Sequence, residues 1–110
     1  MALTSDLTMI ECDRALLRHV SLGRLDGERV RTLRGELAAV TSSWQLLTIA
    51  PEIVARAREP FPDDRIRSLD AIHLASALVA RSRFRDMAMV TLDDRIRGNA
   101  TALGFEVLPV

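Results

Sequence analysis

The feature that most constrains this chain is a regular alternation of short apolar runs with longer segments of helical periodicity. The apolar runs predict strands at residues 2–4, 44–49, 87–92 and 105–108. The helical patterns cover residues 5–23, 26–40, 51–60, 68–82 and 94–103. Strands separated by helices form parallel sheets with helices packed on their faces. The pattern therefore predicts one α/β domain over residues 1–110, in which the run at 44–49 is a buried strand.

Serines and prolines mark the ends of these helices. Ser5 and Ser68 are predicted N-caps, because a serine hydroxyl can accept a hydrogen bond from an N–H of the first helical turn. Pro51 suits the first turn of a helix, where its missing N–H is not needed. Pro60 and Pro62 are expected to end that helix in a loop.

The composition of the chain limits which partners and which cellular location can be expected. Fifteen acidic and fifteen basic residues balance at pH 7, which argues against binding a polyanion through bulk charge but permits a local basic patch. The single cysteine, Cys12, can form no internal disulfide, and no cysteine cluster indicates zinc. The N-terminus lacks a signal-peptide pattern and no apolar run is long enough to cross a membrane, so a reduced, cytoplasmic location is expected.

Glu11 is the first candidate for an acidic site residue. It lies in the helix after the opening strand, on one stripe with Leu7, Arg14 and Arg18. Its spacing from Arg14 also fits an exposed salt bridge, and the spacing alone favours that interpretation.

Asp70 is the second candidate. It falls in the first turn of the helix at 68–82, which is apolar on almost all sides and is therefore expected to be buried. An acid at this position can simply favour the helix dipole, but a carboxylate near the core also needs a partner. The pattern supports both roles equally.

The pair Asp93–Asp94 directly follows the apolar run at 87–92. In parallel α/β sheets, ligands bind at the carboxyl ends of the strands. One of the two acids can cap the next helix, and we assign that supporting role to Asp94. Asp93 is then the predicted ligand-binding acid.

Carboxylates that converge repel each other unless a cation neutralises them, so these acids point to a hard metal ion. Oxygen ligands favour Mg²⁺ or Mn²⁺ over zinc, and such an ion can promote phosphodiester hydrolysis. His73 lies on the same side of its helix as Asp70, but a histidine on a buried helix is more often structural than metal-binding. Trp44 and the three phenylalanines are too scattered for a base-stacking surface and are expected in the core.

Three segments resemble one known family. The run Leu69-Asp70-Ala71-Ile72-His73-Leu74-Ala75-Ser76-Ala77 is similar to the third-acid segment of PIN-domain ribonucleases, especially the VapC toxins. Residues 90–96 and 102–107 resemble the closing strand, acid, helix, glycine and strand of that family. Residues 3–8, with Glu11 and residues 14–15, are similar to its second-acid helix. The order matches over nearly the whole chain, while residues 26–66 match only in element type.

The resemblance implies a three-layer α/β/α fold with a mainly parallel sheet, and a Mg²⁺- or Mn²⁺-dependent endoribonuclease toxin. It implies RNA as the substrate and a VapB-like antitoxin whose C-terminal segment wraps the active site. By position in the motifs, Glu11, Asp70 and Asp93 would be the catalytic acids. Asp70 and Asp93 would bind the metal directly, and Glu11 more often through water. Thr91 would support the site by hydrogen bonding, and Arg14 would hold Glu11 or face the RNA.

One part of the family pattern is absent from this sequence. The family opens with a strand that carries a first acid in an Asp-Thr-Ser or Asp-Ser-Ser setting, whereas this sequence starts at the next element, Met1-Ala2-Leu3-Thr4-Ser5. The absence would remove one metal ligand and a central strand, which would leave backbone edges unpaired. A truncated chain, a rearranged sheet, or completion by another copy in a homodimer or strand-exchanged oligomer would each explain it.

Three functions therefore remain open at this point. The first is RNA hydrolysis by the three acids, with activity put in doubt by the missing first acid. The second is a catalytically inactive PIN-like module that binds an antitoxin peptide. The third is a small flavodoxin-like binding domain, against which the segment around Asp70 argues and for which no glycine-rich phosphate loop is found.

Overall fold

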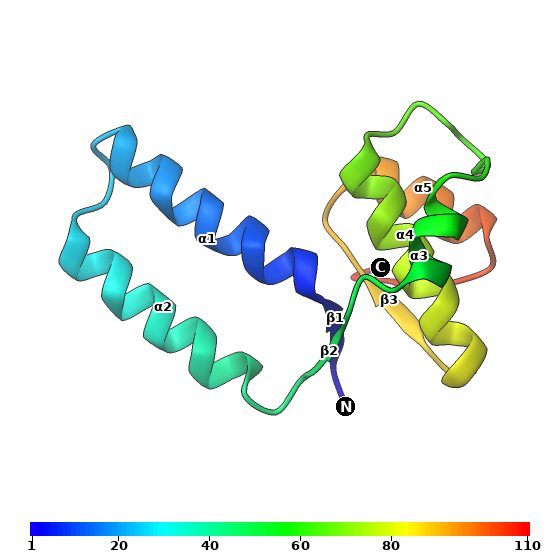
Figure 1. Cartoon of the computed structure of the whole chain (residues 1–110), viewed down its shortest axis with the longest axis horizontal. Coiled ribbons are helices and arrows are strands. Elements are labelled where there is room, and N and C mark those ends of the chain that lie inside the picture. Colours follow the sequence, from blue (N-terminus) through cyan, green and yellow to red (C-terminus); the bar gives the residue numbers. More distant parts are fainter. The chain divides into compact units, whose positions relative to one another are not determined.

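The computed structural model describes residues 1–110 and confirms an α/β chain with parallel strands (Figure 1). The elements in chain order are β1 (Leu3–Ser5), α1 (Asp6–Ser21), α2 (Gly27–Thr41), β2 (Gln45–Leu47), α3 (Pro51–Ala57), α4 (Ser68–Arg83), β3 (Ala88–Val90), α5 (Asp94–Ala102) and β4 (Glu106–Leu108). The strands form two separate parallel pairs, β1 with β2 and β3 with β4, where the alternation pattern predicted one sheet. The chain divides into two compact units, residues 1–48 and 49–110.

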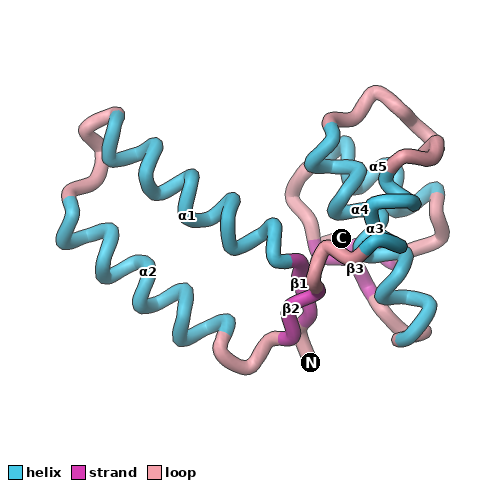
Figure 2. Tube along the Cα trace, viewed as in Figure 1, coloured by secondary structure: helices cyan, strands magenta, loops and turns pink.

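The unit at 1–48 is a helical hairpin whose two ends lead into the β1–β2 pair (Figure 2). The hydroxyl of Ser5 accepts a hydrogen bond from the Leu7 N–H at 3.1 Å, which confirms the predicted cap of α1. An ion pair of 3.1 Å between Arg34 and Asp13 joins the two helices. The predicted burial of the strand at 44–49 is wrong, since Leu46 is 48% exposed. Strand β2 pairs with β1 alone, so one of its backbone edges has no strand partner.

The unit at 49–110 contains the main hydrophobic core, which surrounds α4. Leu74 and Ala75 of α4 are completely buried, as the apolar pattern of this helix predicted. Side chains from α3, α5 and the segments next to them complete the core: Ile53, Phe61, Ala71, Ile96, Ala100 and Phe105. Phe61 and Phe105 are thus core residues as expected, whereas Phe84 is exposed and Trp44 is half-buried.

A glycine turn places the last strand beside β3. Helix α5 ends at Ala102, and Gly104 adopts a positive φ of 89°, which few other residues tolerate. The N–H of Gly104 donates to the Thr101 carbonyl, and the Phe105 N–H donates to the Ala100 carbonyl, which satisfies two carbonyls at the helix end. Strand β4 then pairs with β3 in parallel, and both strands end at the edge that carries the candidate site.

The starts of α3 and α4 differ in how well the sequence predicted them. Pro51 is the first residue of α3, as expected, and that helix ends at Ala57, before Pro60. The predicted cap at Ser68 is wrong, because the N-cap of α4 is Arg67 and Ser68 is the first helical residue. The carboxylate of Asp70 instead accepts a hydrogen bond from the backbone N–H of the N-cap residue, Arg67, at 3.1 Å.

None of the helices combines the length and apolar character needed to span a membrane.

Candidate active site

Asp70 is a buried carboxylate at the start of α4. Its side chain is only 4% exposed, yet it lies within one turn of the helix N-terminus. The Oδ2 atom accepts hydrogen bonds from the Arg67 backbone N–H at 3.1 Å and from the Arg67 Nε at 3.3 Å. These two hydrogen bonds hold the Asp70 side chain in one position beside the core.

Asp93 lies at the junction between β3 and α5. One of its carboxylate oxygens contacts the first turn of α5 and the other lies near Arg67. The Oδ1 atom caps α5 by accepting the N–H groups of Arg95 at 2.8 Å and Ile96 at 3.3 Å. The Oδ2 atom lies 4.0 Å from Nη2 of Arg67. The assignment of the cap to Asp94 is therefore wrong. Asp94 is the exposed first residue of α5, where the predicted helix begins, so the cap is the residue before it, Asp93.

Thr91 orients this junction. Its hydroxyl oxygen accepts the backbone N–H of Asp93 at 3.1 Å, and its own N–H donates to the Leu108 carbonyl at 2.9 Å. One residue therefore ties the backbone of Asp93 to the end of β4. The supporting role at the active site that the family resemblance implied for Thr91 stays a prediction.

Arg67 is the residue that brings the two acids into one cluster. Its guanidinium contacts Asp70 through Nε at 3.3 Å and Asp93 through Nη2 at 4.0 Å. Two carboxylates that share a cation in this way come from helix starts that are far apart in the sequence. Sequence reasoning missed Arg67, although its position three residues before Asp70 was a usable signal, because an N3 acid commonly reaches back to the N-cap.

Arg97 is a second arginine that sequence reasoning missed. Its Nη2 donates to the Thr91 carbonyl and its Nη1 to the Pro109 carbonyl, both at 2.8 Å. These carbonyls lie just after the ends of β3 and β4, where the backbone has no further strand partner. Arg97 thereby fixes the strand edge from which Asp93 projects. No motif in the sequence indicated this contact.

The loop that leads into Arg67 is anchored from α5. Asn99 is almost fully buried, and its side chain accepts the Asp63 N–H at 2.9 Å and donates to the Asp63 carbonyl at 3.0 Å. On the outer side of the loop, Arg65 pairs with Asp63 through two contacts of 3.0 Å. This hydrogen-bonded pairing lowers the pKa of the Asp63 carboxyl and raises that of Arg65.

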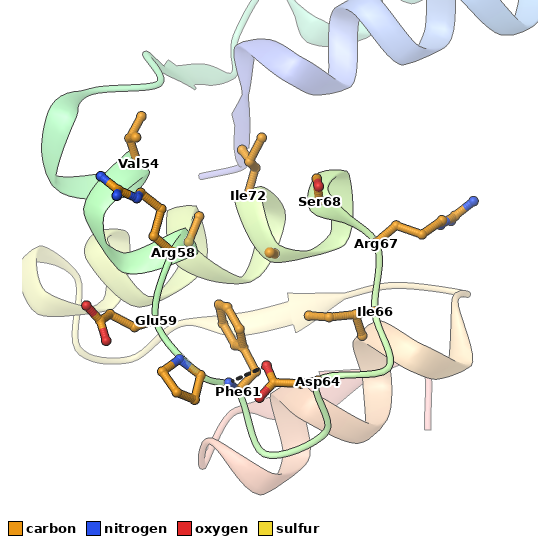
Figure 3. Close-up of a pocket in the computed structure, with 12 residues that line it drawn as sticks. Val54, Arg58, Glu59, Phe61, Asp64, Ile66, Arg67, Ser68 and Ile72 are labelled. Carbon is orange, nitrogen blue, oxygen red and sulfur yellow. Dashed lines mark hydrogen bonds between the residues drawn. The ribbon is translucent and has the colours of Figure 1, made fainter.

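A cavity of about 550 Å³ lies between α3, this loop and the start of α4 (Figure 3). Its apolar wall includes Val54, Phe61, Ile66 and Ile72, and Arg67 stands at its edge with the side chain directed away from it. The Phe61 N–H donates to Asp64 Oδ1 at 2.8 Å, which stabilises the bend of the loop (Figure 3). Neither Asp70 nor Asp93 lines this cavity, so it is separate from the acidic pair.

The donor set of the cluster fits a hard divalent ion. Asp70 and Asp93 offer carboxylate oxygens, and both already contact one shared cation. Mg²⁺ in proteins often has only one or two carboxylate ligands and keeps several waters. No group of three histidine, cysteine, aspartate or glutamate side chains gathers as a metal cluster in the structure. An ion held by Asp70 and Asp93 would therefore complete its shell with water or with substrate oxygens.

The remaining predicted site residues lie away from this cluster in the sequence. Glu11 is half-buried in α1 and Arg14 is exposed one turn further along, both within the unit at 1–48. His73 is half-buried in α4, three residues after Asp70. The catalytic role of Glu11, the supporting role of Arg14 and the structural role favoured for His73 all stay predictions.

Comparison with known proteins identifies the family. A family model described as the PIN domain matches residues 1–101. The chain belongs to the PIN-domain family. Ribonuclease VapC35 of Mycobacterium tuberculosis, from strain CDC 1551 / Oshkosh and equally from strain ATCC 25618 / H37Rv, is 38% identical over 109 residues. The alignment covers 96% of this chain and 70% of the relative. No solved structure matches.

Membership of the PIN-domain family confirms the resemblance seen in the sequence and its α/β fold. In this PIN domain, the segment at 69–77 is the first half of α4 and includes its buried acid. The segment around Asp93 forms the turn between β3 and α5. The two most specific motifs thus supply the two carboxylates that meet at Arg67.

Proposed function

We propose that this PIN domain is a VapC-type toxin, a metal-dependent endoribonuclease that hydrolyses phosphodiester bonds in RNA. The observation that carries the proposal is the pair of carboxylates, Asp70 and Asp93, that faces one cation at the starts of α4 and α5. The similarity to a protein named as a ribonuclease, over nearly all of this chain, supports the same reaction.

Asp70 and Asp93 would hold the divalent ion, Mg²⁺ or Mn²⁺. When bound, such an ion polarises a phosphoryl oxygen and lowers the pKa of a water molecule that it coordinates. Burial in the first turn of α4 fixes the Asp70 carboxylate in place, so little reorganisation is needed on binding. The Thr91 hydroxyl and the cap of α5 fix the Asp93 carboxylate in the same way.

Arginines around the acidic pair would bind the substrate. A guanidinium can donate two parallel hydrogen bonds to a phosphate, and an arginine does not lose its charge at neutral pH. Arg67 and Arg95 flank the two acids, and both side chains belong to exposed residues. Glu11 is proposed as a third acid that acts through water, with Arg14 holding it or facing the RNA.

The test is cleavage of a mixed RNA substrate by the 110-residue chain with Mg²⁺ or Mn²⁺. Asp70→Asn and Asp93→Asn should each reduce the rate at least about a hundredfold, because each removes one carboxylate charge from the site. Asp86→Asn, at an exposed loop position, is the matched control and should leave the rate unchanged. Equal rates in wild type and in both site variants would exclude this site.

A VapB-like antitoxin is the proposed protein partner, and a homodimer or strand-exchanged oligomer in the cytoplasm is the proposed working form. Each of the two sheets has only two strands, so every strand keeps an edge that another strand could pair with. Light scattering at micromolar concentration should give a mass above that of one 12.2 kDa chain. Tight binding of an antitoxin peptide without metal-dependent cleavage would instead support an inactive binding module.

A further inference from the structure

The guanidinium of Arg67 contacts both carboxylates of the cluster. It contacts Oδ2 of Asp70 at 3.3 Å and Oδ2 of Asp93 at 4.0 Å, so one oxygen of each acid is directed at the same group. The other oxygen of Asp93 is committed to the cap of α5. A divalent ion that Asp70 and Asp93 hold together would therefore need Oδ2 of Asp93, the oxygen that Arg67 now contacts, and would lie next to the Asp70–Arg67 ion pair.

The three side chains differ in exposure, and this difference would allow a metal ion to replace the Arg67 guanidinium beside the two acids. The Arg67 side chain is 67% exposed, whereas that of Asp70 is 4% exposed and that of Asp93 is 38% exposed. The acids are fixed by the helix starts, while most of the arginine side chain lies in solvent. The backbone N–H of Arg67 also donates to Asp70, so the main chain can stay in place when the guanidinium moves.

We propose that Arg67 is a built-in counter-cation that competes with the divalent ion for Asp70 and Asp93. In the metal-free chain, its guanidinium offsets the repulsion between the two carboxylates. When a divalent ion binds, the guanidinium leaves the acids and becomes available to a phosphate of the substrate. This inference rests on the proposed metal-dependent function and names the residue that sets its metal affinity.

The chain offers a matched control for this role. Arg65 lies two residues earlier in the same loop and carries the same charge, but its side chain is 91% exposed and pairs with Asp63 instead of the two site acids. Removing either arginine changes the net charge of the loop equally. A difference between the two variants therefore reports contact with the site acids and not general electrostatics.

The first experiment measures Mn²⁺ binding to the full chain by isothermal titration calorimetry. Arg67→Gln should bind Mn²⁺ about fivefold more tightly than wild type, the effect expected when one exposed ion pair no longer competes. Arg67→Lys, which keeps the charge but has no planar fork to reach both acids, should fall between the two. Arg65→Gln should match wild type, and Asp70→Asn should bind at least about tenfold more weakly than wild type.

The second experiment follows the guanidinium itself. Phenylglyoxal modifies accessible arginines, and peptide mass spectrometry gives the modification rate at each position. Saturation with Mn²⁺ should increase the rate at Arg67 at least about twofold and leave the rate at Arg65 unchanged. This readout needs no RNA and no activity.

The outcomes separate this inference from the proposed function. Weaker binding by Asp70→Asn, together with equal affinities for Arg67→Gln and Arg65→Gln, would overturn the role of Arg67 but leave the metal site standing. An Arg67 modification rate that does not respond to Mn²⁺ would also overturn it. If neither wild type nor Arg67→Gln binds Mn²⁺ while circular dichroism shows that both are folded, the proposed metal site and the proposed role of Arg67 are both wrong.

Discussion

The two oxygens of Asp93 make it possible to separate the stability of α5 from the chemistry of the site. Oδ1 caps the helix through the N–H groups of Arg95 and Ile96, whereas Oδ2 faces Arg67. Asp93→Ala removes both functions. Asp93→Ser keeps a side-chain oxygen that can cap the helix, but it removes the carboxylate that would bind a metal.

The structure sets the size of the expected effects. Helix α5 has only nine residues and is held to the core by Ile96, Asn99 and Ala100, so its first turn matters to the whole unit. Replacing an N-cap aspartate by alanine costs about 1 kcal/mol, whereas a serine in its place should cost about 0.3 kcal/mol. A loss of 1 kcal/mol corresponds to a decrease of about 4–8 °C in Tm for a domain of this size.

Urea unfolding followed by circular dichroism, together with RNA cleavage, tests both parts. Asp93→Ala should lose stability and cleavage, and Asp93→Ser should lose cleavage while remaining close to wild type in free energy of unfolding. If the serine variant is destabilised as much as the alanine variant, the assignment of the helix cap to one oxygen and of the site contact to the other is wrong. If the serine variant cleaves RNA at the wild-type rate, the carboxylate is not part of the site.

Three further predictions concern the frame around the site. Asn99→Ala should lower the free energy of unfolding by about 2 kcal/mol in urea denaturation, because it leaves the N–H and the carbonyl of Asp63 without their partner. The Asp63 carboxyl should titrate below its ordinary pKa of 3.8 by NMR, and Arg65→Gln should raise that pKa. Since the folded-state pKa is lowered, the stabilisation from this pair is present above pH 3.8 and is lost as the pH falls through the folded-state value. Gly104→Ala should cost about 1 kcal/mol in thermal unfolding because φ is 89° there, whereas Gly35→Ala, inside α2 with open space around its Cβ, should not destabilise the chain.

Much of the fold could be predicted because each element carries its own local signal. The apolar periodicity of residues 68–82 located α4 to within one residue at its C-terminal end, and the glycine at 104 marked the turn before the last strand. The strands were harder to describe, because each has only three residues and its burial depends on which neighbours it pairs with. The exposed Leu46 and the two separate sheets are consequences of such pairing, which no local pattern specifies.

The candidate site was predictable in its acids but not in its cations. Asp70 stood out as an acid in the first turn of an apolar helix, and Asp93 as an acid directly after an apolar strand, and both are local sequence signals. Arg67 and Arg97 act through long side chains that reach across the fold, to Asp93 in one case and to the Thr91 carbonyl in the other. A sequence gives the charge of such a side chain but not the direction in which it extends.

The error at Asp93 and Asp94 shows why capping and function should not be treated as alternatives. The sequence interpretation gave one role to each acid, which assumes that a carboxylate used as a cap is no longer available. A carboxylate has two oxygens, and the capping geometry at Asp93 uses Oδ1 alone. The cap fixes the orientation of the side chain, so it also fixes where Oδ2 lies and brings it near Arg67. Capping is therefore the means by which the fold positions this acid, as the N3 hydrogen bond from the Arg67 N–H positions Asp70.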